Sequence, residues 1–128
     1  MRSGSGAGAY TTTSAVYVDV DTANLSYTVV VPAGQKVLIA AALGGHGVGV
    51  ASGGNVAITD GTTVLREHTG IAATTEVKMA LLYVFVGDGA SHTFKLRFLW
   101  NNGGTNFTIT NTSATETPTM TFWLGPAS

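Results

Sequence analysis

The chain has 128 residues and a mass of 13.1 kDa, enough for one domain with its own hydrophobic core. Six basic and seven acidic residues give a net charge of -1, which excludes the basic surface of a general nucleic-acid-binding protein. The absence of cysteine excludes disulfides, thiol catalysis and cysteine-ligated zinc. No apolar run reaches the roughly 18 residues of a transmembrane helix, and residues 1–9 lack the apolar stretch of a signal peptide. We therefore expect no nucleic-acid partner and no membrane partner.

The charge content is low. Charged residues make up 10% of the chain, against about 25% in an average soluble domain. The sequence is rich in threonine, glycine and valine, which suits sheets whose polar faces are covered with hydroxyl groups. Such a surface favours association, because charges normally keep small domains apart. We expect a protein that packs against copies of itself or against partners. The alternative is a monomer that its threonine hydroxyls keep in solution.

The N-terminal part of the chain is divided between an arm and a first strand. Residues 1–9 are mostly small, and we expect a flexible N-terminal arm. Strand-like alternation begins at Tyr10. The first predicted strand carries apolar residues at alternate positions, Val16, Val18 and Val20. The segment 10–128 is expected to form a single β-sandwich domain.

The next segments alternate between strands and glycine-containing turns. A second strand, Leu25–Val31, ends at the turn Pro32–Gln35, where proline fixes φ and glycine permits a positive φ. The apolar run Lys36–Leu43 is typical of a strand that is covered on both faces. The segment Gly44–Gly54 predicts a glycine-rich loop that is a candidate for ligand binding. The dipeptide Asp60-Gly61 predicts a tight hairpin between strands at 55–59 and 62–67.

The second half of the chain predicts the remaining strands. Thr75–Val86 is compatible with both strand and helix spacing, and its β-branched and aromatic second half favours a strand. His92–Trp100 alternates cleanly between apolar and polar residues. Asn106–Thr110 and the segment after Pro118 predict the last strands. The closing strand points three apolar residues to one side, Met120, Phe122 and Leu124.

These elements predict an all-β fold, an eight-stranded antiparallel β-sandwich whose most economical topology is a jelly roll. An immunoglobulin-like topology is the alternative, although its cysteine and tryptophan signature is missing.

No metal-ligand motif is present. The three histidines, His46, His68 and His92, lack the local spacing of ligand pairs, so we expect ordinary hydrogen-bonded side chains. Asp19, Asp21 and Asn24 lack the glycine and the terminal glutamate of a calcium loop. A single cation held by the two aspartates and a backbone carbonyl is the alternative. We expect no metal and no cofactor.

No catalytic motif is present either. The glycine-rich stretch lacks the Gly-Lys-Ser/Thr ending of a phosphate loop, and Gly4-Ser5-Gly6 lacks the spacing of a nucleophile elbow. Glu67 and Glu76 lie on different predicted strands, which opposes a glycosidase pair. We expect a protein that is not an enzyme and has no catalytic residues. Three formal glycosylation sequons are attributed to chance in a chain rich in serine and threonine; they begin at Asn24, Asn106 and Asn111.

Three aromatic residues are candidates for exposed contacts, Trp123, Tyr17 and Trp100. Trp123 is out of phase with the core positions of its strand, so it points to a subunit interface, to the edge of the sandwich or to a sugar.

Four segments share a rhythm of strands and turns, Ser26–Ile39, Asp60–Val64, Gly89–Leu96 and Thr119–Leu124. Through them residues 16–124 resemble the small jelly-roll structural proteins of tailed bacteriophage virions, which are head decoration, minor capsid or tail-associated proteins. The resemblance implies a structural role on the capsid surface, commonly as a homotrimer and without a cofactor. It implies the major capsid protein or other virion proteins as partners, and synthesis in the cytoplasm of the bacterial host.

In such a particle we expect the arm to order only on assembly, by adding a strand to the sheet of a neighbouring subunit. The expected interface residues are Ser3, Gly4, Ser5, Tyr17 and Trp123. The alternative function is a tail-fibre or carbohydrate-binding module that recognises host-surface glycans through loops and exposed aromatic rings.

Overall fold

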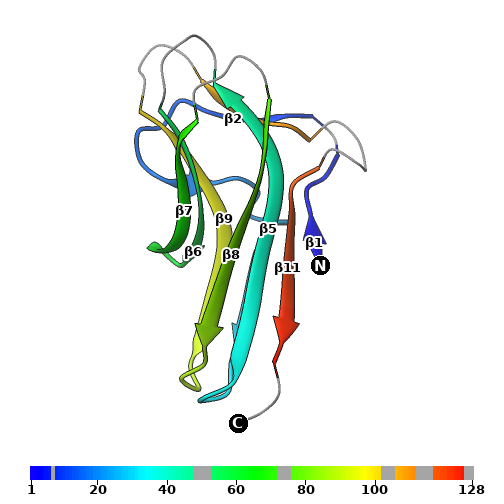
Figure 1. The fold of residues 1–128 in the computed structure, drawn as a ribbon, viewed down its shortest axis with the longest axis vertical. Coiled ribbons are helices and arrows are strands. Elements are labelled where there is room, and N and C mark those ends of the chain that lie inside the picture. The colour runs from blue at the N-terminus through cyan, green and yellow to red at the C-terminus, as the bar shows by residue number, and fades with distance from the viewer. Residues whose placement is uncertain (7, 48–52, 72–75, 102–105, 112–116, 126–128) are drawn as a thin grey trace.

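The computed structural model describes residues 1–6, 8–47, 53–71, 76–101, 106–111 and 117–125. This part of the chain forms eleven strands and no helix, which confirms the all-β prediction (Figure 1). The strands form two antiparallel sheets, called sheet A and sheet B below. The count exceeds the predicted eight because several strands are only two or three residues long. The first predicted strand, for example, is reduced to Val18–Asp19, and Val16 is exposed.

Sheet A has six strands. Its central strand β5 pairs with β8 along one edge, while β11 and β10 share the other edge. The short strands β1 and β2 lie outside β11 and β10, respectively. Figure 1 shows β8, β5, β11 and β1 side by side. The bounds are β1 Arg2–Ser3, β2 Tyr10–Thr12, β5 Lys36–Gly47, β8 Val77–Val86, β10 Phe107–Ile109 and β11 Thr119–Leu124.

Sheet B has five strands. Its central strand β9 pairs with β6 on one edge, and β7 lies outside β6. The strands β3 and β4 pair with successive parts of the other edge of β9. The bounds are β3 Val18–Asp19, β4 Ser26–Val30, β6 Gly54–Asp60, β7 Thr63–Ile71 and β9 Ser91–Trp100.

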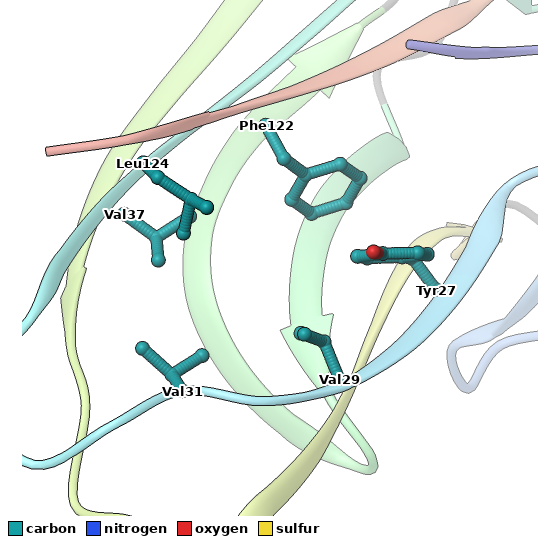
Figure 2. Close-up of a pocket in the computed structure, with 6 residues that line it drawn as sticks. All are labelled: Tyr27, Val29, Val31, Val37, Phe122 and Leu124. Carbon is teal, nitrogen blue, oxygen red and sulfur yellow. The ribbon is translucent and has the colours of Figure 1, made fainter.

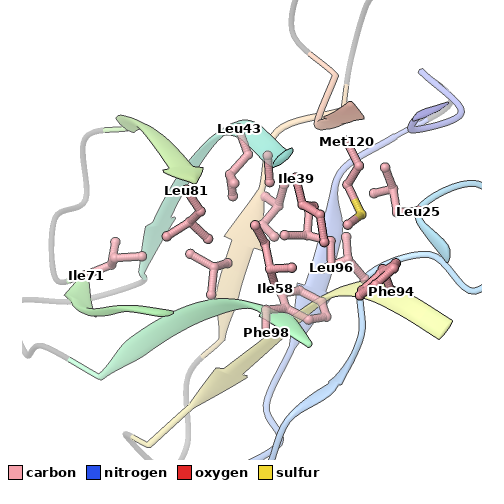
Figure 3. Close-up of a cluster of buried hydrophobic side chains, with 14 of the residues drawn as sticks. Leu25, Ile39, Leu43, Ile58, Ile71, Leu81, Phe94, Leu96, Phe98 and Met120 are labelled. Atoms are coloured by element: carbon pink, nitrogen blue, oxygen red, sulfur yellow. The ribbon is translucent and has the colours of Figure 1, made fainter. Parts of the chain in front are cut away.

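The two sheets pack face to face around one hydrophobic core (Figure 3). The ring of Phe94 is fully buried, with centroids 5.0 Å from Phe85 of β8 and 6.0 Å from Phe122 of β11. In another part of the core Trp100 stacks on Phe107 at 6.2 Å. Burying one large apolar side chain contributes about 1.5–3 kcal/mol. These contacts between the sheets therefore supply much of the stability, and the sandwich prediction agrees with them.

The predicted turns and the ambiguous segment are confirmed. In the turn Pro32–Gln35, Gly34 has a φ of 80°. In the hairpin Asp60–Thr63, Gly61 has a φ of 55°. Both angles lie in the region that glycine adopts at low cost. The segment that fitted both strand and helix spacing is a strand over Val77–Val86.

The predicted loop Gly44–Gly54 is wrong at its start, because β5 continues as a strand to Gly47. Glycine is used there for packing. A Cβ at Gly45 would lie 2.9 Å from Cζ of Phe107, and one at Gly47 would lie 2.3 Å from Cη2 of Trp100. The aromatic rings occupy the space that side chains would need. The composition predicted a loop because a sequence pattern does not show which ring lies against a glycine.

The N-terminal arm also differs from the expectation. We expected residues 1–9 to be flexible before assembly, but Arg2 and Ser3 pair with Met120 and Thr119 of the chain's own sheet A. The amide of Gly4 donates to the carbonyl of Pro118 at 2.9 Å. The arm therefore occupies part of the edge of β11, where it forms ladder hydrogen bonds within the same chain.

Candidate functional site

The outer face of sheet A carries a continuous apolar surface. In β5, β8 and β11 alternate residues point away from the core, and the register places Val84, Leu38 and Trp123 in one row across the three strands. Leu82 and Val86 lie in the neighbouring rows. The exposed fraction of these five side chains is 36–56%. We call them the sheet A patch.

This surface corrects one expectation from the sequence. The apolar run Lys36–Leu43 predicted a strand covered on both faces, but the described residues cover only its inner face. Val37 and Ile39 are buried, whereas Leu38 is exposed. All five residues are at least 36% exposed and lie in neighbouring rows, and a contiguous exposed apolar surface of this kind often marks a contact surface. The patch therefore has the properties of a contact surface.

Few charges interrupt the patch. The charged side chains that β5, β8 and β11 carry on this face are Lys36 and Lys78, one toward each end. Lys78 is paired with Glu76 at 3.1 Å. A second protein surface that packs here loses few solvated charges.

The outer face of sheet B has the opposite character. Asp19 accepts hydrogen bonds from Lys95 at 3.0 Å and from Arg97 at 2.9 Å. Partial burial by itself raises the pKa of Asp19, but the hydrogen bonds and charges of the two cations outweigh it and hold the pKa below its ordinary value. Thr28 and Thr93 share a hydrogen bond at 2.9 Å on the same sheet. This face is therefore solvated and internally paired.

Tyr17 belongs to this polar face. Its hydroxyl donates to Glu67 of β7 at 2.7 Å. Because β9 and β6 lie between β3 and β7, the side chain crosses both strands, where Ala57 and Leu99 are buried despite their outward positions. Burial and then the hydrogen bond to Glu67 raise the pKa of the Tyr17 hydroxyl. Tyr17 was predicted as an interface residue, and the structure gives it an intramolecular role.

The two aspartates considered for a cation point to different partners. Asp19 is occupied by Lys95 and Arg97. Asp21 accepts the backbone amides of Ala23 at 3.0 Å and Asn24 at 2.9 Å, the Asn24 side-chain amide at 2.8 Å, and the hydroxyl of Tyr10. Burial acts to raise the pKa of Asp21, but these hydrogen bonds lower it overall. Asp21 thus holds a turn together.

The three histidines lie on three strands. His92 of β9 is hydrogen-bonded at both ring nitrogens, by Nδ1 to Asp60 at 2.6 Å and by Nε2 to Asp88 at 2.8 Å. The hydrogen bonds to Asp88 and then to Asp60 raise the pKa of His92. His46 lies on β5 of sheet A and His68 on β7 of sheet B. Within the described residues, the Nδ1 of His46 is buried without a hydrogen-bond partner, and no three metal-ligating side chains converge.

The predicted interface residues of the arm surround a buried asparagine. Ser3, Gly4 and Ser5 line a shallow polar hollow. Asn111 is fully buried beneath the arm, where its side chain donates to Ser5 Oγ at 3.1 Å and to the Gly8 carbonyl at 2.8 Å. In the sequence, Asn111 stands out only as the first residue of a chance sequon. A single asparagine in a threonine-rich segment gives no pattern from which its role as an anchor follows.

The two tryptophans have different environments. Trp123 is half-exposed on the outer face of sheet A, on the side predicted from its phase, whereas Trp100 is buried in the core. Glu67 and Glu76, which were considered as a carboxylate pair, lie beside Tyr17 of sheet B and over Gly44 of sheet A. Residues 48–52 of the candidate binding loop lie outside the described residues.

No protein-family model matches the chain, and no curated protein is significantly similar to it. Among the described residues there is no helix of the length and hydrophobicity needed to cross a bilayer. The candidate site is the apolar outer face of sheet A. The outer face of sheet B differs from it, because its polar groups are paired within the chain.

Proposed function

We propose that this protein is a non-enzymatic structural subunit that binds other protein subunits through the sheet A patch. The observation that carries the proposal is the uninterrupted row of Val84, Leu38 and Trp123 on an outer sheet face. Apolar side chains in such a position are stabilised only when another surface removes them from water. The stabilisation is about 25 cal/mol per Å² of apolar surface buried. The low charge content of the whole chain supports the same role.

The specific setting that we propose is a bacteriophage virion, with the protein as a capsid decoration or minor capsid protein. The resemblance of residues 16–124 to small virion proteins supports this setting, as does a domain without disulfides that has one face suited to contact. As a homotrimer, the protein would present three copies of each contact to a shell of major capsid subunits. Several weak contacts then add up, because each one raises the local concentration for the next.

We also propose a jelly-roll topology. Several short strands lie one after the other along the same edge and together fill one strand position. This holds for β1 and β2, for β3 and β4, and for β10 and β11. Numbered in chain order, the eight positions then pair as 1 with 8, 2 with 7, 3 with 6, and 4 with 5. This is the pairing of one long antiparallel hairpin rolled into two sheets, which supports a jelly roll over an immunoglobulin-like order.

The native mass in solution tests the proposal. Light scattering after size exclusion, over a tenfold range of concentration, is expected to give three times 13.1 kDa for the natural sequence. Val84→Lys places a charge in the sheet A patch and is expected to give the monomer mass. Val30→Lys is the matched control, because Val30 is similarly exposed on sheet B, 58% against 53% for Val84. A monomer throughout, or equal masses for both variants, would overturn the proposal.

A second candidate function is the recognition of host-surface glycans. The exposed indole of Trp123 favours it, because a half-exposed aromatic ring on a flat face can stack on a sugar. Tryptophan fluorescence during titration with host cell-wall glycan tests this candidate. Trp100 is buried against Phe107, so a saturable change that disappears in Trp123→Phe would report binding at the exposed ring.

A further inference from the structure

A cavity opens between the two sheets at the side of the sandwich formed by β4 and β11 (Figure 2). Tyr27, Val29 and Val31 face Phe122, Leu124 and Val37 across it. Its volume is about 140 Å³, and all six lining residues are apolar or aromatic. This is close to the roughly 150 Å³ of an apolar cavity that binds benzene. The cavity therefore has room for a large apolar side chain.

The edge of β11 beside this cavity is unpaired within the described residues. β1 pairs only with Thr119 and Met120, and no described strand continues along Thr121–Leu124 on that side. The carbonyl of Pro118 points toward β1, where it accepts from Gly4, while the amide of Gly125 points toward β5. Hydrogen-bonding directions alternate along an antiparallel strand. The amides and carbonyls of Phe122 and Leu124 therefore point to the open edge.

The register of β1 shows where the side chains of an added strand would lie. Arg2 pairs with Met120, which faces the core, and the Arg2 guanidinium lies 5.2 Å from the centre of the Tyr27 ring at the margin of the cavity. A strand that continues the path of β1 would place residues opposite Phe122 and Leu124. Because directly paired residues point to the same face, those two side chains, spaced i and i+2, would point toward the cavity, which has room for one of them to enter.

The other exposed edge of sheet A is partly occupied. Along β8, the Nε of Arg66 donates to the carbonyl of Leu82 at 3.1 Å, so a side chain of sheet B occupies an edge acceptor. Charged side chains at an edge are a common protection against unwanted strand pairing. In the described structure, no charged side chain occupies the edge of β11 between Thr121 and Leu124.

We propose that the edge of β11 and the adjoining cavity form a binding site for an extended segment of a partner protein, which adds as a strand antiparallel to β11. Backbone hydrogen bonds to Phe122 and Leu124 supply affinity, and the cavity selects apolar side chains at two alternate positions. Arg2 lies at the end where the C-terminal side of the segment arrives, so a carboxylate at that end complements its charge. The site is separate from the sheet A patch, which lies on the outer face.

Amide NMR spectra of the full chain test this site with a defined probe. The probe is the peptide acetyl-Thr-Leu-Thr-Val with a free terminal carboxylate, and the control peptide is acetyl-Thr-Asn-Thr-Ser, which cannot fill the cavity. We expect saturable shifts of the Phe122 and Leu124 amides with the probe at millimolar concentration, and none with the control peptide. No shift would overturn the proposal. Shifts of Thr28 and Val30 instead would place the segment on β4, and shifts that depend on protein concentration alone would identify a second copy as the occupant; either result overturns it.

Two variants test the site. Leu124→Pro removes an edge-facing amide, and with it one side chain that lines the cavity, without removing a hydrogen bond to β5. Val29→Phe fills the cavity and leaves the edge of β11 unchanged. Each is expected to weaken probe binding at least tenfold. Thr28→Pro, which acts on the free edge of β4, is the matched control and should bind like the natural sequence. If Leu124→Pro fails to fold, Val29→Phe alone decides the result. Val84→Lys should leave probe binding unchanged, so failure of this site and failure of the proposed function are distinguishable.

Discussion

The two outer faces of this sandwich have the same strand geometry but different side chains. On sheet B, Asp19 joins Lys95 and Arg97, and Tyr17 joins Glu67, so polar groups are paired within the chain. On sheet A, the corresponding positions are leucine, valine, alanine and tryptophan without partners among the described residues. A face that meets water is completed by its own hydrogen bonds. We propose that the unpaired outer face of sheet A is covered by another protein.

The comparison also separates stability from function. The pairs of sheet B contribute to the free energy of folding of a single chain, because both partners belong to it. The exposed side chains of the sheet A patch contribute little to that free energy, and under the proposed function they contribute to association instead. Substitutions on the two faces should therefore be detected by different measurements.

The largest effect on folding is expected from Asp19→Ala. The Asp19 side chain is only 18% exposed, and its loss leaves Lys95 and Arg97 as partly buried cations without their acid. The free energy of unfolding should fall by about 2 kcal/mol, measured by urea denaturation at neutral pH. Lys78→Ala on sheet A is the control, because that lysine is 66% exposed and its ion pair should contribute less than about 0.5 kcal/mol. Equal losses would contradict the contrast between the faces.

A pH-dependent effect is expected at His92, where sheet B approaches β8. The hydrogen bonds to Asp88 and then to Asp60 raise the pKa of His92 above its ordinary value of 6.5, and the ring lies 4.6 Å from that of Phe85. Protonation is therefore favoured in the folded state, so the contribution to stability is present below pH 6.5 and is lost as the pH rises through the folded pKa. Urea denaturation of the natural protein and of His92→Gln at several pH values measures this loss. Parallel pH profiles for the two proteins would show that His92 is not its source.

The smallest effect on folding is expected for Leu82→Thr in the sheet A patch. This side chain is 56% exposed, and threonine is well suited to a strand. The free energy of unfolding of the monomer should change by less than about 0.5 kcal/mol, measured at a concentration where the protein is dissociated. The native mass at higher concentration should fall in the same variant. A loss of folding stability above 1 kcal/mol would mean that Leu82 packs within the monomer, and the patch would be smaller than described.

The sequence predicted the strand content and the turns well, and its failures have physical causes. The alternation of apolar and polar residues predicted β9, and the glycines in turn sequences predicted the turns at Gly34 and Gly61. Glycine composition gave a wrong loop at Gly44–Gly47, because the rings that require those glycines come from β9 and β10. The arm was expected to be free, and its docking depends on Asn111, which is distant in the sequence. Both failures concern contacts between segments that are far apart along the chain.

The site shows the same division. Trp123 was predicted to face away from the core from its phase alone, and it does. The full patch was not predicted, because β8 is apolar in both phases, with Leu81 and Phe85 in one and Leu82 and Val84 in the other. A period of two assigns residues to faces, but it identifies the buried face only when the two faces differ in polarity.

By itself, therefore, the sequence determined an all-β chain with little charge, its turns and most of its strand segments, since these depend on neighbouring residues. The tertiary structure decided which face of sheet A is buried, where the arm lies and where an open edge meets a cavity. Each of these depends on which strand comes to lie beside another. In this fold such partners can be far apart in the sequence, as Arg2 and Met120 are, at 118 positions (120 − 2).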